Sequence, residues 1–388
     1  MAAWRAAFGV HGRSPASCYG GGMSERILVT GATGHIGTAL LPRLLDDPAA
    51  VVVALIRAKD AEHLEVRRKA LVGSLPPEAD GNRVVAVAGD VSAKGLGLSD
   101  ADHARVLGEV TAIIHSAASV RFDMPEDKAS EENIGSVEEI LTLARALAER
   151  GTLLRLDHVS TAYVAGDRVG RALETECDVG QGFRNSYEWS KCKAEMNVRA
   201  AIAAGLPAAI HRPSIVVGDS RTGETKAFNV LYWPLKLYAR GWWRLFPGSP
   251  DTLVDIVPVD FVAEAIATLR RDVATIGECF NLAAGDDAQR VDVLAERFAT
   301  ELGRPKIRYV EPGMYVKWVR PILAAPISLT KRGRSILRGG KAYLPYFRGN
   351  PLFDTTNLRH RLGRGAPPVL DYVDQILRFA KEQDFGGR

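Results

Sequence analysis

Short apolar runs recur along this chain, separated by longer segments that have one apolar and one polar face. The runs are rich in Val, Ile, Leu and Ala, which is typical of strands buried on both faces of a parallel sheet. They lie at residues 27–30, 51–56, 84–88, 112–115, 153–159, 207–210 and 278–282. Because helical patterns alternate with these runs, we expect an α/β fold built on one doubly wound parallel sheet of the Rossmann type.

The segments between the runs are predicted to be helices. The first helix follows residue 37, and residues 126–150 are expected to form one long helix that contains Asn133. Residues 291–302 and 369–381 are further predicted helices, the second of them amphipathic. Residues 224–250 are unusually rich in aromatic and apolar side chains, which fits either ordinary packing or an apolar tunnel.

The length of 388 residues accommodates one large domain and a smaller lobe. Residues 1–22 have no strand or helix pattern, and we expect them to be a disordered leader. A dinucleotide-binding domain is predicted over 23–283, with a substrate insertion near 218–255, and a substrate-binding lobe over 284–388. That last lobe is basic: residues 301–388 hold 17 Lys or Arg and 7 Asp or Glu. Such an excess of positive charge fits an anionic partner or simply a solvated surface.

The four cysteines, Cys18, Cys177, Cys192 and Cys279, have neither CxxC nor metal-ligand spacing. Without a signal peptide, this usage favours the reducing cytoplasm and no bound metal. No apolar run reaches 18 residues, so we expect no transmembrane segment. We expect no nucleic-acid partner.

A glycine-rich turn follows the first apolar run. Gly31, Gly34 and Gly37 have the spacing of a dinucleotide-binding turn, between a strand and an amphipathic helix. The helix N-terminus after Gly37 offers free N–H groups and a positive dipole end to a pyrophosphate. Thr33, His35 and Ile36 complete the predicted phosphate turn, and the His35 side chain is expected to point outward.

Three later strand ends supply further cofactor contacts. Arg57 ends the second run, and no acid lies within residues 51–57, which favours NADP over NAD because Arg neutralises the extra phosphate. Asp90 follows the third run and is placed to accept from the adenine amino group. The small side chains that follow the fourth run leave room for the cofactor. The remaining residues assigned to cofactor binding here are Val91, Ala117 and Ala118.

The candidate chemistry lies at Ser160-Thr161 and at a Tyr-x-x-x-Lys helix. Tyr187 and Lys191 are four residues apart and so share one helix face. A lysine ammonium near a phenol is expected to lower its pKa, which suits a proton donor or acceptor near neutral pH. A hydroxyl at the end of the fifth strand can hold the reacting carbonyl oxygen. Cys192 follows Lys191, but a covalent route would need an activated thiolate.

The chain resembles the extended short-chain dehydrogenases in its TGATGHIG, HSAASV, VSTAY and YEWSK segments. Within that superfamily it is similar to the fatty acyl-CoA reductases and the thioester-reductase domains of carboxylic acid reductases and peptide synthetases, through HRPSIVVGDSRTG and LVDIVPVDFVAEAI. The resemblance implies Thr161 as the catalytic hydroxyl, Tyr187 as the acid, and Lys191 as the residue that orients the acid and holds the nicotinamide ribose. It also implies that Arg57 and Arg67 grip NADP and that Pro213 walls the cofactor site, while Asn133 resembles a proton-relay residue.

The resemblance implies an NADPH-dependent reductase of an acyl thioester, carried on CoA or on an acyl carrier protein, that yields an aldehyde and, in a second round, an alcohol. Residues 314–338 would then cover the acyl site, contact a membrane surface or receive the carrier's phosphate. Two alternatives stay open on the sequence. One is a reductase or epimerase of a sterol, a sugar nucleotide or a small carbonyl compound, and the other is a non-catalytic NADP-binding regulator.

Overall fold

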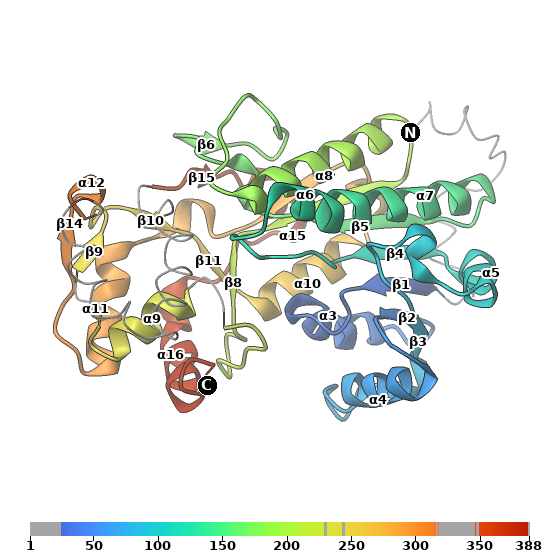
Figure 1. Cartoon of the computed structure of the whole chain (residues 1–388), viewed down its shortest axis with the longest axis horizontal. Helices are drawn as coiled ribbons and strands as arrows, with labels where there is room; N and C mark the ends of the chain where they lie inside the picture. Colours follow the sequence, from blue (N-terminus) through green and yellow to red (C-terminus); the bar gives the residue numbers. More distant parts are fainter. Residues whose placement is uncertain are drawn as a thin grey trace.

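The computed structural model describes residues 25–228, 231–242, 245–315, 317, 346 and 349–386. The predicted leader, residues 1–22, and most of the segment 314–338 lie outside these residues. The centre of the molecule is one seven-stranded parallel sheet with strand order β12-β7-β5-β4-β1-β2-β3 (Figure 1). Its strands are β1 (Arg26–Thr30), β2 (Val51–Ile56), β3 (Val84–Ala88), β4 (Ala112–His115), β5 (Arg155–Val159), β7 (Ala208–Pro213) and β12 (Cys279–Leu282).

Helices cover both faces of the sheet, as the alternating pattern predicts. One face packs on α3 (His35–Leu45), α4 (Ala61–Val72), α10 (Val259–Leu269) and α15 (Thr356–Leu362). The other packs on α5 (Asp100–Glu109), α7 (Ser136–Glu149) and α8 (Ser186–Ala203). These two layers lie on opposite sides of the sheet in Figure 1. The expected doubly wound parallel sheet is therefore confirmed.

The expected single helix over 126–150 is wrong in detail. A short helix α6 (Glu126–Ala129) passes into a π-helical stretch at Ser130–Gly135, and α7 follows. The reason is a set of contacts with other segments, because the buried Asn133 in that stretch bonds outside the helix. Its Oδ1 accepts from the Ser119 N–H at 2.8 Å and its Nδ2 donates to Ser190 Oγ at 3.0 Å. The predicted strand at 207–210 is also too short, because β7 continues to Pro213.

A second, smaller core lies at one end of the sheet. It packs α9 (Tyr232–Ala239), α11 (Val291–Leu302) and α16 (Val373–Glu382) together, at the left of Figure 1. Paired short strands border it: β8 (Ile215–Val217) with β11 (Ile256–Pro258), β9 (Leu245–Pro247) with β14 (Arg308–Val310), and β10 (Leu253–Val254) with β13 (Gln289–Arg290). A further pair joins β6 (Arg171–Ala172) to β15 (Leu352–Phe353). The predicted domain boundaries stay predictions.

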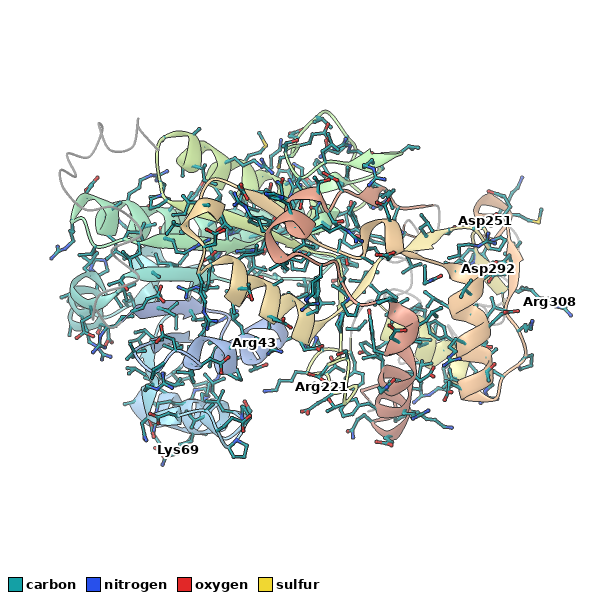
Figure 2. All side chains as sticks on the ribbon, turned by 180° about the vertical axis from the view of Figure 1, so that it is seen from behind. Arg43, Lys69, Arg221, Asp251, Asp292 and Arg308 are labelled. Atoms are coloured by element: carbon teal, nitrogen blue, oxygen red, sulfur yellow. The ribbon has the colours of Figure 1, made fainter. Side chains whose placement is uncertain are left out.

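Charged side chains such as Lys69 on α4 and Arg308 on β14 extend outward from these layers (Figure 2). None of the helices within the described ranges is long and apolar enough to cross a bilayer.

A charged cluster is buried beneath the sheet's central strands. Arg155 Nη2 donates to Asp157 Oδ1 at 2.8 Å, and His211 Nε2 lies 2.9 Å from the same oxygen. Arg270 approaches Asp157 Oδ2 at 3.7 Å, and the Asp157 and Arg155 side chains have no exposed surface. Burial opposes ionisation of Asp157, but Arg155, His211 and Arg270 together lower its pKa to about 2. The carboxylate therefore stabilises the fold by pairing with the buried Arg155 guanidinium, whereas the nearby Arg270 is paired mainly with Glu25 at 2.5 Å.

We predict that Asp157→Ala lowers the free energy of unfolding by about 3–5 kcal/mol, because it leaves the fully buried Arg155 guanidinium without its carboxylate. Urea denaturation measures the change. The control is Asp286→Ala, which breaks an exposed ion pair with Arg171 and should cost less than about 1 kcal/mol. In the wild type, the contribution of Asp157 is present above its unfolded pKa of about 3.9 and is lost as the pH falls toward 2. Equal losses for both variants would contradict this account.

Candidate active site

A cleft of about 670 Å³ opens at the carboxyl ends of the central strands. Most of the residues predicted for cofactor binding and catalysis line it, and only Gly37, Arg67 and Lys191 do not. This is where a doubly wound sheet places its ligand, because the loops that leave neighbouring strands diverge there. Ser92, Ser119, Val120, Arg121 and Phe122 also line the cleft.

The glycine turn has the geometry of a phosphate cradle. Gly31 has φ +72°, and a Cβ there would lie 2.8 Å from the Ala117 nitrogen. A Cβ on Gly37 would lie 2.1 Å from the Gly31 carbonyl oxygen, so both positions require glycine. Helix α3 begins after Gly34 without a side-chain cap. Its first turn thus presents N–H groups to the cleft beside Thr33 and Ile36, which suits a pyrophosphate.

His35 does not point outward as expected. Its ring is largely buried, and Nε2 lies 3.0 Å from the Val217 carbonyl oxygen. The side chain therefore joins the phosphate turn to β8. Burial lowers the His35 pKa, so the ring is neutral at physiological pH.

The end of the cleft at which the adenosine is predicted to bind lies beyond β2 and β3. The Arg57 side chain is 74% exposed, and its Nε lies 3.8 Å from Asp90 Oδ2. Asp90 Oδ1 accepts from the Ser92 N–H and hydroxyl, so that oxygen is already engaged. Arg67 does not line the cleft; its guanidinium donates to the Arg57 carbonyl oxygen at 2.6 Å. Arg67 thus supports the backbone from which Arg57 extends, and Val91 lines the cleft beside them.

The middle of the cleft is formed by the loop after β4. Ala117 and Ala118 line it with small side chains. The Ala117 N–H donates to Thr30 Oγ1 at 3.3 Å, which ties this loop to the end of β1. On the opposite side, Pro213 ends β7 and accepts a hydrogen bond from Thr161 Oγ1 at 3.4 Å.

The predicted catalytic hydroxyls lie together. Thr161 is the second residue after the end of β5. Its side chain is hydrogen-bonded to the Tyr187 phenol. Tyr187 lies in the first turn of α8, whose N-terminus is capped by the Asn185 side chain. Lys191 is buried one turn farther along α8, and its Nζ donates to the Val159 carbonyl oxygen at 3.0 Å.

The expected fall in the Tyr187 pKa is not found. Burial raises that pKa to about 12, and the hydrogen bond with Thr161 offsets only part of the rise. Burial also lowers the pKa of Lys191 to about 8, against the opposing effect of Glu195. The lysine therefore does not make the phenol acidic in this state of the protein. Tyr187 carries its proton at neutral pH, as a proton donor must.

Sequence reasoning missed the aromatic wall around this phenol. Phe122 lies 5.5 Å from Tyr187, ring centre to ring centre, and Tyr346 lies 5.5 Å from Phe122. Tyr163 meets Tyr346 edge to face at 5.4 Å. Tyr163 belongs to the VSTAY segment and Phe122 follows HSAASV, so proximity in sequence to those motifs was an available signal. Tyr346 comes from a distant segment, and no sequence motif near it indicated that it would lie here.

A second, apolar cavity adjoins the cleft, with about 120 Å³ open to water-sized molecules. Tyr163, Ile215 and Tyr346 line both spaces. Six of its other lining residues come from the aromatic-rich segment 224–250: Leu231, Pro234, Leu235, Tyr238, Leu245 and Phe246. Helix α11 closes the far side with Leu294, Ala295 and Phe298. The aromatic-rich segment therefore lines an apolar cavity that adjoins the cleft in which Thr161 and Tyr187 lie.

Comparison with known proteins agrees with this geometry. A family model for NAD-binding proteins, described as "Male sterility protein", matches residues 29–266. The crystal structure of the terminal R domain from the myxalamid PKS-NRPS biosynthetic pathway superposes with a TM-score of 0.78 and 29% identity, over 94% of this chain and 92% of that one. The match includes the smaller lobe as well as the sheet, since it covers nearly the whole of both chains.

Two curated relatives are longer proteins. A linear gramicidin synthase from Brevibacillus parabrevis is 29% identical over 386 residues, which is 94% of this chain and 7% of that protein. Fatty acyl-CoA reductase wat of Drosophila melanogaster is 28% identical over 287 residues, 64% of this chain and 54% of that protein. This chain therefore spans only part of the length of the curated relatives it matches.

We predict that Gly37→Ala weakens dinucleotide binding at least tenfold and lowers the melting temperature, because its Cβ would collide with the Gly31 carbonyl. Titration of the cofactor by fluorescence measures the affinity. Gly108→Ala in α5 is the control, since its Cβ would meet nothing within 4 Å. That control should bind normally and gain up to about 1 kcal/mol of stability. If Gly37→Ala bound the dinucleotide normally, the glycine turn would not be the dinucleotide-binding element.

Proposed function

This chain belongs to the male sterility protein family of NAD-binding proteins, and on that premise we propose that it is an NADPH-dependent reductase of an acyl thioester. The observation that carries the proposal is the junction of the two cavities. The pair Thr161 and Tyr187 lies in the large cleft, and Tyr163, Ile215 and Tyr346 line both that cleft and the apolar cavity beside it. A carbonyl held at the pair can thus have its apolar chain in the second cavity.

A dinucleotide held by the glycine turn and Arg57 would supply a hydride to the thioester carbonyl carbon. Thr161 and Tyr187 hydroxyls bind the carbonyl oxygen, where negative charge develops. The Tyr187 phenol then gives its proton to that oxygen, and its high pKa keeps the proton available until the oxygen becomes more basic. The Lys191 ammonium is held at the Val159 carbonyl oxygen, one turn of α8 beyond Tyr187, where it can bind the ribose of the cofactor. The hemithioacetal so formed collapses to an aldehyde and a free thiol.

Arg57 supports NADP as the form of the cofactor. Its side chain is exposed at the adenosine end of the cleft, and within Val51–Ile56 there is no acid to bind a free ribose hydroxyl. A guanidinium at this position pairs with a phosphate through charged hydrogen bonds. The Arg67 bond to the Arg57 carbonyl oxygen fixes the backbone that presents it.

The apolar lining of the second cavity favours an acyl chain over a sugar nucleotide. Leu235, Phe246, Leu294 and Phe298 offer no hydrogen bonds to sugar hydroxyls, whereas each buried methylene gains about 0.8 kcal/mol. The names of the relatives, a gramicidin synthase, an R domain and an acyl-CoA reductase, point to a carrier protein or CoA as the carrier. We propose as substrate an acyl thioester, the class of compound that a carrier protein and CoA both carry.

The cofactor assignment predicts that Arg57→Ala weakens NADPH roughly ten- to a hundredfold and NADH little, since a charged hydrogen bond contributes about 1.5–3 kcal/mol. Isothermal titration of both cofactors measures this. Arg68→Ala is the matched control on α4, because Arg68 pairs with Glu65 and should leave both affinities unchanged. Equal losses for NADPH and NADH in Arg57→Ala would show that Arg57 does not read the phosphate.

The substrate assignment predicts NADPH oxidation with acyl-CoA thioesters that strengthens with chain length. Three additional buried methylenes should lower KM by about fiftyfold until the cavity is full. Ala295→Phe narrows the cavity and should raise KM for long chains while short chains react as before. A protein that ignores every thioester but reduces a ketone, a sterol or a sugar nucleotide would overturn the proposal.

A further inference from the structure

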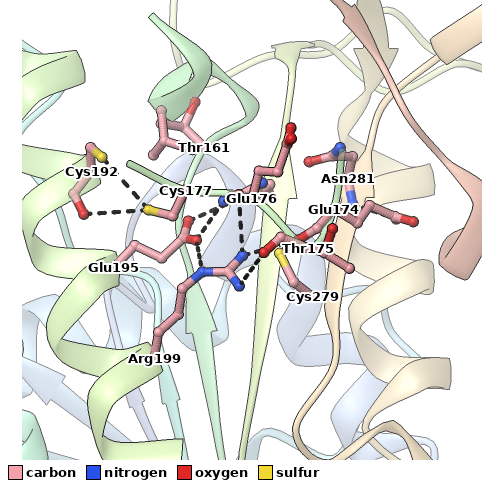
Figure 3. A network of polar contacts seen from close by, with 12 residues as sticks. Thr161, Glu174, Thr175, Glu176, Cys177, Cys192, Glu195, Arg199, Cys279 and Asn281 are labelled. Atoms are coloured by element: carbon pink, nitrogen blue, oxygen red, sulfur yellow. Dashed lines mark hydrogen bonds and ion pairs between the residues drawn. The ribbon is translucent and has the colours of Figure 1, made fainter. Parts of the chain in front are cut away.

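Two cysteine thiols touch behind the catalytic helix. The sulfur atoms of Cys177 and Cys192 lie 3.6 Å apart, and both side chains are buried, with exposed fractions of 9% and 0% (Figure 3). Cys177 Sγ also lies 3.7 Å from the Cys192 carbonyl oxygen. Both thiols are free. Their separation of fifteen residues along the chain gave no hint of this pairing.

Hydrogen bonds to backbone carbonyl oxygens hold the Cys177 segment against α8. Arg199 of α8 donates to the carbonyl oxygens of Glu174, Thr175 and Glu176. Gln181, on the other side of Cys177, donates to the Cys177 and Val164 carbonyl oxygens. Backbone hydrogen bonds on both sides of Cys177 therefore bring its sulfur close to that of Cys192.

We propose that Cys177 and Cys192 are a redox-active dithiol that a peroxide oxidises to a disulfide. A disulfide bond measures about 2.05 Å, so the sulfurs must approach by roughly 1.6 Å. Cys192 lies within a helix, but Cys177 lies in the irregular segment between β6 and α8. The irregular segment that carries Cys177 can therefore move to bring the two sulfur atoms together.

The oxidation balances with hydrogen peroxide as the oxidant. One thiolate attacks a peroxide oxygen, the O–O bond breaks, and a sulfenic acid and water form. The second sulfur then displaces the hydroxyl of that sulfenic acid, which leaves as a second water. Two electrons pass from the thiols to the peroxide, and one S–S bond replaces two S–H bonds.

The bond would act on the reaction through α8. Cys192 directly follows Lys191, and the ring closed by the disulfide contains Tyr187. The same segment carries Asn185, which caps α8 with its Oδ1 and donates to the Tyr346 hydroxyl with its Nδ2. Drawing the segment inward thus shifts the end of α8 that carries the phenol. A displacement of about 1 Å at a reacting group can cost a hundredfold in rate, so we expect the oxidised protein to turn over at least tenfold more slowly; this consequence rests on the proposed function.

Peptide mapping tests the site without reference to activity. The full chain is treated with hydrogen peroxide, unfolded in the presence of N-ethylmaleimide, digested and analysed by mass spectrometry. We expect a peptide pair linked between Cys177 and Cys192, lighter by two hydrogens and restored by dithiothreitol. Cys279→Ser should form the same link, whereas Cys177→Ser and Cys192→Ser should not. Full alkylation of both thiols in the treated wild type, or a link to Cys279 instead, would overturn the proposal even if a variant failed to fold.

Turnover tests the consequence separately. The oxidised wild type should lose at least tenfold in NADPH oxidation with its best thioester and recover with dithiothreitol, while Cys177→Ser stays active under peroxide. A linked protein with unchanged turnover would overturn the effect on the reaction. If no thioester is reduced at any stage, the proposed function fails, and the mapping still decides whether the dithiol exists.

Discussion

A bidentate ion pair between Arg212 on β7 and Glu195 on α8 holds the catalytic helix on the sheet. Arg212 Nε and Nη2 donate to the two Glu195 carboxylate oxygens at 2.9 and 2.6 Å, and both side chains are almost fully buried. Burial opposes ionisation of Glu195, but the attraction of the Arg212 and Arg199 charges is the larger effect and lowers the Glu195 pKa to about 2. Because a fork-shaped guanidinium fixes direction as well as distance, the pair sets the rotation of α8. That rotation aims Tyr187 at Thr161, and the network around Glu195 also fixes the Cys177 segment (Figure 3).

Burial of the site also shifts the pKa values of its two titratable groups, Tyr187 and Lys191. Taking the phenol out of water raises the pKa of Tyr187 to about 12, and taking the ammonium out of water lowers that of Lys191 to about 8. A proton leaves Tyr187 only when an equally strong base forms at its hydroxyl, and the oxygen of a reduced carbonyl is such a base. The chain therefore favours reduction coupled to proton delivery over a standing phenolate.

Much of this could be predicted from sequence because it follows from local rules. The strands come from apolar runs, the phosphate turn from glycine spacing, and the Tyr187–Lys191 face from helical periodicity. What failed depends on contacts between distant segments. The break at Ser130–Gly135 exists because Asn133 bonds to Ser119 and Ser190. His35 turns inward because Val217 offers a carbonyl, and Tyr346, which stacks on Phe122, comes from a segment without a motif. The Tyr187 pKa depends on burial, which spacing along a helix does not reveal.

The central claim is that the Tyr187 phenol delivers the proton while the two cavities bind the reactants. Tyr187→Phe separates the two roles, since the ring stays and only the hydroxyl is lost. Stopped-flow measurement of NADPH binding and of thioester reduction in this variant is the most direct test, with Tyr309→Phe on β14 as the control. The account predicts NADPH affinity within about twofold of the wild type and turnover lower by about two orders of magnitude or more. Near-normal turnover in Tyr187→Phe, with binding intact, would contradict it.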